Sequence, residues 1–131
     1  MIRKVFLISL SLLTICFISC GESEESQMRE TVIEAVKAQS SCDVDRYLQY
    51  ADFGEEPDSL HVTLLRSILA RHKTVVERKG GVSDIITMPC TPKTDSLAYM
   101  GYTVRYLDGT QEQKIATLVK KKEHWKMSVT Q

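Results

Sequence analysis

Among the side chains that could act as a general acid or base, we consider four as candidates: His61, His72, Asp84 and His124. Such a group serves proton transfer when burial and neighbouring charges tune its pKa. His61 and His72 fall on a predicted helix or just beyond its core stripe, which favours a surface or rim position, and His124 falls in a predicted turn. Asp84, in a predicted strand, could point into a cavity, although a strand-edge position is the commoner outcome. No spacing brings two of them together, so no catalytic residue is predicted.

Metal and cofactor chemistry has no stronger basis in the sequence. The three histidines share no helix face at i, i+4 spacing, and Cys42 and Cys90 lack a second pair of ligands. The sequence contains no Gly-rich phosphate loop and no nucleophile elbow. We therefore expect no metal and no cofactor, and the sequence leans against an enzyme.

Aromatic residues near the C-terminus offer a non-catalytic alternative. Tyr102 and Tyr106 alternate with Met100 on one face of a predicted strand, and Trp125 lies on a later strand. These four side chains could line a pocket for a small apolar or aromatic ligand. The other interpretation is that they are ordinary core residues, since aromatic side chains favour strands in any case.

The first nineteen residues have the layout of a secretory signal peptide. Arg3 and Lys4 precede a run over residues 5–18 that carries no charge. Fourteen residues are too few to span a bilayer as a helix, which needs about 20. With residues 1–19 removed, Lys plus Arg falls from 17 to 15 against 17 Asp plus Glu, a balance of −2. Nothing in this balance indicates a nucleic-acid partner.

Two cysteines remain in the later part of the chain, Cys42 and Cys90. An exported chain matures in an oxidising compartment, where an isolated pair can form a disulfide. The alternative is two buried free thiols that pack as small apolar residues. Both readings stay open at the level of the sequence.

The periodicity predicts three helices. Residues 26–38 carry apolar side chains at three- and four-residue spacing. Asp43 can cap a short second helix, and a third helix begins near Asp58 or Ser59 and ends before Lys79. Its predicted core face consists of Leu60, Leu64, Leu65, Ile68 and Leu69.

The period then changes to two, which predicts strands. Residues 82–88 are rich in β-branched side chains, residues 98–106 alternate, and Asp108 with Gly109 supplies a hairpin turn. A return strand and a last strand around Trp125 follow. We predict one α+β domain over residues 27–131, in which N-terminal helices pack on a curved antiparallel sheet of about four strands.

The residues around Cys20 carry a resemblance. Phe17, Ile18 and Ser19 before Cys20 resemble the lipobox of bacterial lipoproteins, although Phe17 replaces the usual leucine. The resemblance implies cleavage after Ser19 and acylation of Cys20, which would anchor the protein to the outer membrane, either in the periplasm or at the cell surface. Two or three acyl chains, palmitate among them, suffice for stable anchoring.

The segment after Cys20 is acidic and polar, and it predicts a flexible tether over residues 20–26. Its composition also resembles the acidic tract that directs some lipoproteins of Gram-negative bacteria to the cell surface. In either reading the tether would hold the domain away from the bilayer.

The folded part also resembles a known family. Three features match: the opening VIEAVKAQSSCDVDRYLQYAD, the hairpin YTVRYLDGTQEQKIATLVKKKEHWKMSV and the HWKM around Trp125. They are similar to the cone-shaped nuclear transport factor 2-like (cystatin-like) domain, and more narrowly to small bacterial lipoproteins related to lumazine-binding-like proteins. Members of that superfamily use the cone as an enzyme pocket, a ligand site or a dimer surface, so the fold does not fix the function.

Three functional hypotheses follow. The first is a lipid-anchored, non-catalytic binding module of the bacterial envelope with an unknown small ligand or protein partner. The second is a cavity enzyme of the isomerase or dehydratase type that acts on a small hydrophobic substrate. The third is a structural partner whose sheet face docks a neighbouring protein or a second copy in a homodimer.

Overall fold

The computed structural model describes residues 23–129. The predicted signal peptide, residues 1–19, and the predicted lipidation site, Cys20, lie outside the described residues. Within the described part of the chain, no helix is both long enough and apolar enough to cross a membrane.

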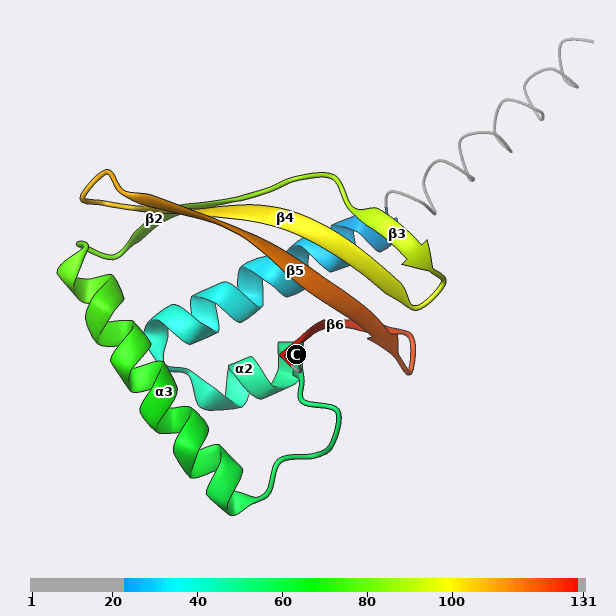
Figure 1. Ribbon diagram of the computed structural model, residues 1–131, viewed down its shortest axis with the longest axis horizontal. Coiled ribbons are helices and arrows are strands. Elements are labelled where there is room, and N and C mark those ends of the chain that lie inside the picture. The colour runs from blue at the N-terminus through cyan, green and yellow to red at the C-terminus, as the bar shows by residue number, and fades with distance from the viewer. Residues whose placement is uncertain (1–22, 130–131) are drawn as a thin grey trace, which may run out of the picture.

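The first helix covers residues 23–41 and runs along the concave side of the sheet (Figure 1). It buries Met28, Val32, Ala35 and Val36, the apolar residues that give the segment its helical period. Residues 23–26 are already helical, although the polar composition predicted that they belong to the flexible tether. An ion pair between Glu24 and Lys120, 2.8 Å apart, connects this first turn to the sheet.

The second helix, α2 (Val44–Tyr50), begins where its cap predicts. The Asp43 carboxylate accepts a hydrogen bond from the backbone N–H of Arg46 at 3.2 Å, which satisfies one of the free donors at a helix N-terminus. Cys42 just before it has φ of 56°, so the chain turns sharply between the two helices. α2 therefore packs beside the first helix as a short, separate element (Figure 1).

The third helix, α3 (Ser59–Arg78), has the predicted ends but a different buried face. Asp58 caps it by accepting from the N–H of His61 at 2.9 Å. Leu69 and Val76 are its buried residues, whereas Leu60, Leu64 and Ile68 are exposed, contrary to the predicted core face. The sequence of α3 contains two rows of apolar side chains, and only the row with Leu69 and Val76 packs against the rest of the domain.

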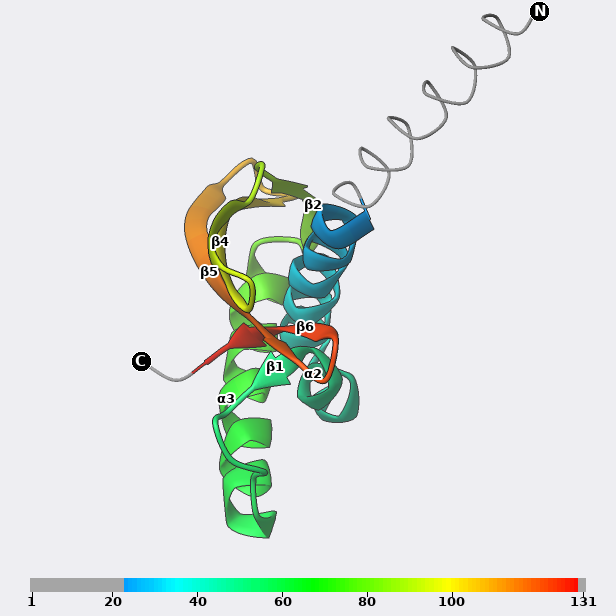
Figure 2. The same ribbon diagram turned by 90° about the vertical axis from the view of Figure 1, so that its right-hand side faces the viewer.

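The sheet has six strands, more than the four predicted, in the order β1-β6-β5-β4-β2, with β3 paired to β4 beyond the end of β2. β1 pairs with β6 in parallel and the other pairs are antiparallel, so the sheet is mixed. It curves around the first helix, as Figure 2 shows end-on. The α+β class and the cone shape are confirmed. The strands are β1 (Ala51–Asp52), β2 (Val82–Thr87), β3 (Thr91–Thr94), β4 (Leu97–Tyr106), β5 (Gln111–Lys121) and β6 (His124–Ser128).

The register of β4 against β5 assigns side chains to the two faces of the sheet. Tyr102 lies opposite Lys114, and Gly101 lies opposite Ile115. Tyr102 is buried and Ile115 is exposed, so even-numbered residues of both strands face the helices and odd-numbered residues face outward. The inner face thus carries the core, together with Lys114 near its edge.

Of the two alternatives for Cys42 and Cys90, the structure contains free thiols and no disulfide. Cys42 follows the C-terminal end of the first helix. Cys90 lies near its N-terminal end, where Glu24 and Glu25 help to raise the pKa of the Cys90 thiol, after burial, which is the main cause. A helix rises about 1.5 Å per residue, so the two thiols are roughly 25 Å apart. Bridged cysteines need Cα atoms within about 7 Å.

Candidate functional site

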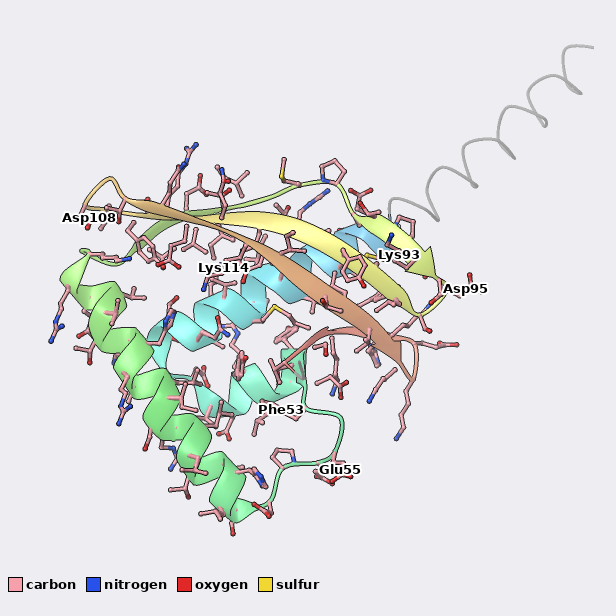
Figure 3. All side chains as sticks on the ribbon, in the orientation of Figure 1. Phe53, Glu55, Lys93, Asp95, Asp108 and Lys114 are labelled. Carbon is pink, nitrogen blue, oxygen red and sulfur yellow. The ribbon has the colours of Figure 1, made fainter. Side chains whose placement is uncertain are left out.

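A surface pocket of about 400 Å³ lies beside the loop that joins β1 to α3, and we call it the loop pocket. Phe53, at the start of the loop, lies toward α2, and Glu55 lies on the outer side of the loop (Figure 3). The Phe53 ring packs edge-on against Tyr47, with the two ring centroids 6.0 Å apart. This contact fixes one wall of the pocket, because Tyr47 is buried in the core. The lining residues are Leu48, Ala51, Asp52, Phe53, Gly54, Glu55, Glu56, Pro57, Val62 and Lys126.

The loop pocket has four charged lining residues, Asp52, Glu55, Glu56 and Lys126, beside its apolar walls. Asp52 accepts hydrogen bonds from Lys121 Nζ at 3.1 Å and from the backbone N–H of Gly54 at 3.3 Å. Gly54 has φ of 81°, a conformation that side chains with a Cβ rarely adopt, and it turns the loop back over the pocket. Small organic ligands bind where apolar walls accompany positioned polar groups, and Leu48, Phe53 and Val62 beside the fixed Asp52 carboxylate provide that combination.

A second cluster of functional side chains forms where the end of α3 meets β5, and we call it the α3–β5 cluster. Its charged members are His72, Lys79, Glu112 and Lys114. The Glu112 carboxylate bridges two ammonium groups, with Lys79 Nζ at 3.1 Å from one oxygen and Lys114 Nζ at 3.5 Å from the other. Lys79 Nζ also lies 4.5 Å from the centre of the Tyr106 ring, a cation–π contact.

The charges of the α3–β5 cluster shift the pKa values of its own side chains. The pKa of His72 is lowered, first by partial burial and then by the positive charge of Lys114, while Glu112 opposes the shift. The hydrogen bond from Lys79 lowers the pKa of Glu112, because it stabilises the carboxylate. Burial raises the pKa of Tyr102 to about 12, so this phenol stays protonated. The lowered pKa favours the neutral imidazole of His72, and the raised pKa keeps the buried phenol of Tyr102, on the same face of β4 as Tyr106, neutral.

The residues predicted to line a pocket mostly fill the core. Met100, Tyr102 and Tyr106 are buried on the inner face of the sheet, and Met100 has no exposed surface. Trp125, also buried, borders two other surface hollows of about 500 and 300 Å³. Tyr106 joins the α3–β5 cluster through its ring contact with Lys79.

The candidate acids and bases are dispersed over the surface, with one exception. His61 is exposed and pairs with Asp58 at the start of α3, 2.8 Å away, and His124 is exposed at the start of β6. Asp84 is an exposed residue of β2. His72, predicted as a rim residue, is the candidate that meets charged groups of another element, on β5. Its partners on β5 are about forty positions later in the chain, and no local pattern signals that contact.

The sequence-predicted site missed the loop pocket entirely. Its walls come from α2, β1, the following loop, α3 and β6, so they converge only through the fold. One signal was available: Gly54 and Pro57 mark an irregular loop between two helices, and binding residues often lie on such loops. Among the described residues, no group of three or more His, Cys, Asp or Glu side chains could hold a metal ion.

Comparison with solved structures identifies the fold. A crystal structure from Campylobacter jejuni, described as a "Putative NTF2-like transpeptidase", superposes with a TM-score of 0.65 at 20% sequence identity. The match covers 78% of this chain and 98% of that chain. No family model matches the sequence, and no curated protein matches it either. The likeness at this identity shows a nuclear transport factor 2-like fold and leaves the function to be argued from the site.

Proposed function

We propose that the protein is a lipid-anchored module of the bacterial cell envelope that binds a small, largely apolar ligand in the loop pocket without catalysis. The lipid anchor is Cys20, and the outer membrane is its location. The ligand lies against Leu48, Phe53 and Val62, and a polar group on it pairs with Asp52 or Lys126. A relationship to lumazine-binding-like lipoproteins is part of the same proposal.

The shape and composition of the loop pocket are the main support for the binding role. A volume of about 400 Å³ falls within the range of small-molecule sites. Its wall is held in place by the packing of Phe53 on Tyr47, so a ligand would not have to order it. The loop pocket lies at the surface and the interior of the cone is filled by the core, so the support for binding comes from the pocket itself.

The anchor is tested by replacing Cys20 with alanine in the native bacterium. We expect the wild-type protein in the membrane fraction and Cys20→Ala in the soluble fraction. Cys42→Ala is the matched control, because it also removes a thiol and should stay with the membranes. If Cys20→Ala remains in the membrane fraction, the anchor is wrong.

The ligand is tested by native purification followed by extraction and mass spectrometry of bound small molecules. An extracted compound added back to the ligand-free protein should shift the NMR signals of Phe53, Gly54 and Val62. Val62→Trp, which fills the pocket from α3, should abolish the shifts, whereas Val75→Trp on the exposed part of α3 should keep them. If no compound returns to these residues, the binding proposal fails.

A cavity enzyme is the second candidate, and the α3–β5 cluster is the observation that favours it. The pKa of His72 is lowered by partial burial and by Lys114, and Glu112 bridges Lys79 and Lys114 beside it, so a candidate base lies next to a carboxylate and two ammonium groups. The transpeptidase description of the Campylobacter jejuni protein also names an enzyme. If a compound shifts the NMR signals of His72 and Lys114 and is chemically converted during incubation with the protein, the protein is an enzyme and the binding proposal is wrong.

A further inference from the structure

α3 presents a stripe of large aliphatic side chains to solvent, and we call it the α3 stripe: Leu60, Leu64, Ile68 and Val75. All four are exposed, with Leu60 the most so at 65%. At 100° per residue they fall within an arc of about 80°, along one line of the helix. Leu69 and Val76, which pack into the domain, lie on the other side. The stripe is thus a second apolar face and not part of the core.

The position of α3 makes the stripe accessible to a large partner. In Figure 1 α3 is the outermost element on the left of the molecule, and Figure 2 shows its lower part extending well below the sheet. Its 20 residues span about 30 Å. Contiguous exposed apolar surface of this kind usually marks an interaction site.

The net charge differs between the two ends of α3. Glu55, Glu56 and Asp58 precede the helix and outnumber Arg66 in its first half, whereas Arg71, Lys73 and Arg78 outnumber Glu77 in its second half. Arg71 falls within the arc of the stripe, where its aliphatic stem can cover apolar surface while the guanidinium reaches the rim. An antiparallel copy of the same helix would place each acidic end beside a basic end.

We propose that the α3 stripe is a self-association surface, on which two copies of the protein pair through antiparallel α3 helices. The midpoint of the stripe falls at Ile68, so the two Ile68 side chains meet near the two-fold axis. Leu60 of one copy then packs against Val75 of the other, and Arg78 approaches Glu56. Such a pair is isologous, since both copies use the same residues.

The size of the surface limits the strength of the pairing. One face of a helix about 30 Å long buries less than the roughly 1,000 Å² total that a stable interface needs. We therefore expect weak pairing in solution and stronger pairing on a membrane, where anchoring raises the effective concentration. This last step rests on the proposed anchor at Cys20. The pairing itself does not require it.

Disulfide trapping in native cells tests the arrangement with the full chain. In a background with Cys42→Ser and Cys90→Ser, Ile68→Cys should give a covalent dimer under mild oxidation. Ile115→Cys is the matched control, because Ile115 is the same residue type and is even more exposed, 76% against 61% for Ile68, on the outer face of the sheet. We expect a dimer band from Ile68→Cys and its absence from Ile115→Cys. The opposite result, or no band from either, overturns the proposal.

Charge exchange tests the antiparallel orientation. Arg78→Glu added to Ile68→Cys should reduce the trapped dimer, because it places two acidic groups together. Glu56→Arg added to that variant should restore the band. If Arg78→Glu has no effect, or if Glu56→Arg fails to restore the band, the antiparallel pairing is wrong.

Sedimentation of the soluble Cys20→Ala protein separates the pairing from the anchor. We expect a weak monomer–dimer equilibrium, which Leu64→Asp should abolish. A Cys20→Ala protein that sediments only as a monomer contradicts the proposal.

Discussion

The hydroxyl of Thr31 lies 3.1 Å from the backbone carbonyl oxygen of Trp125, and the two residues are 94 positions apart in the chain. This contact joins the first helix to β6 inside the core. The same hydroxyl lies 2.9 Å from the carbonyl of Gln27, one turn earlier, so a single O–H is shared between a local and a long-range acceptor. It is a specific tie between the two ends of the folded region.

Thr31→Val should destabilise the protein by about 1 kcal/mol, because the shape is kept while one buried hydrogen bond is lost. Thr74→Val is the matched control. Its hydroxyl bonds to the carbonyl of Ala70 on the exposed side of α3, so it also loses an i−4 bond but crosses to no other element. Urea unfolding measures both changes. Equal effects would show that the contact with Trp125 contributes nothing.

Met100→Ala should cost about 2–5 kcal/mol of unfolding free energy, since Met100 is 0% exposed and leaves a cavity in the core. Ile115→Ala on the adjacent strand should change it by about 0.5 kcal/mol or less, because Ile115 faces solvent. Thermal unfolding of the two variants checks the assignment of inner and outer faces. Similar losses from both would contradict the register of β4 against β5.

His72 should make the protein less stable in mild acid. Its pKa in the folded state lies below the ordinary value of 6.5, because partial burial and Lys114 disfavour the imidazolium. Just below that value the unfolded chain binds more protons than the folded one, so stability falls as the pH falls through this window. Unfolding in urea at several pH values should show a weaker pH dependence in His72→Gln. Lys114→Gln should weaken it in part, and an unchanged profile in both variants would exclude the effect.

Gly80 and Gly109 provide a test of local backbone constraints. Both have positive φ, 85° and 89°. A Cβ at Gly80 would lie 3.0 Å from the Cβ of Leu107, whereas a Cβ at Gly109 meets nothing within 4 Å. Gly109→Ala should therefore cost about 1–2 kcal/mol from the left-handed conformation alone. Gly80→Ala should cost more, and a smaller loss at position 80 than at 109 would show that the turn before β2 relaxes around the new side chain.

The elements that the sequence predicts well depend on local interactions. Asp43 and Asp58 cap their helices with their own side chains, and Asp108 accepts from the N–H of Thr110 in the hairpin turn. Each of these signals lies within three residues of its partner. The alternation of residues 98–106 likewise identifies β4 and its buried face.

The features that the sequence does not predict depend on residues distant in the chain. β1 has two residues, and it exists only because β6 pairs with it in parallel. The exposed stripe of α3 has the same residue types as a core face, and only the packing decides between them. Lys79 and Glu112, which meet in the α3–β5 cluster, are separated by 33 positions. The loop pocket is likewise assembled from five segments.

The two free thiols, Cys42 and Cys90, lie near opposite ends of the first helix, so the distance between them can be measured with labels attached to the native cysteines. Cys42 and Cys90 can each carry a spin label without engineering, and their separation suits pulsed electron paramagnetic resonance, which measures distances of this order. Cys42 lies beside α3, through its contact with the carbonyl of Arg66, and Cys90 lies on the sheet side. A change in the measured distance would report movement of the C-terminal end of the first helix relative to the segment between β2 and β3 that holds Cys90.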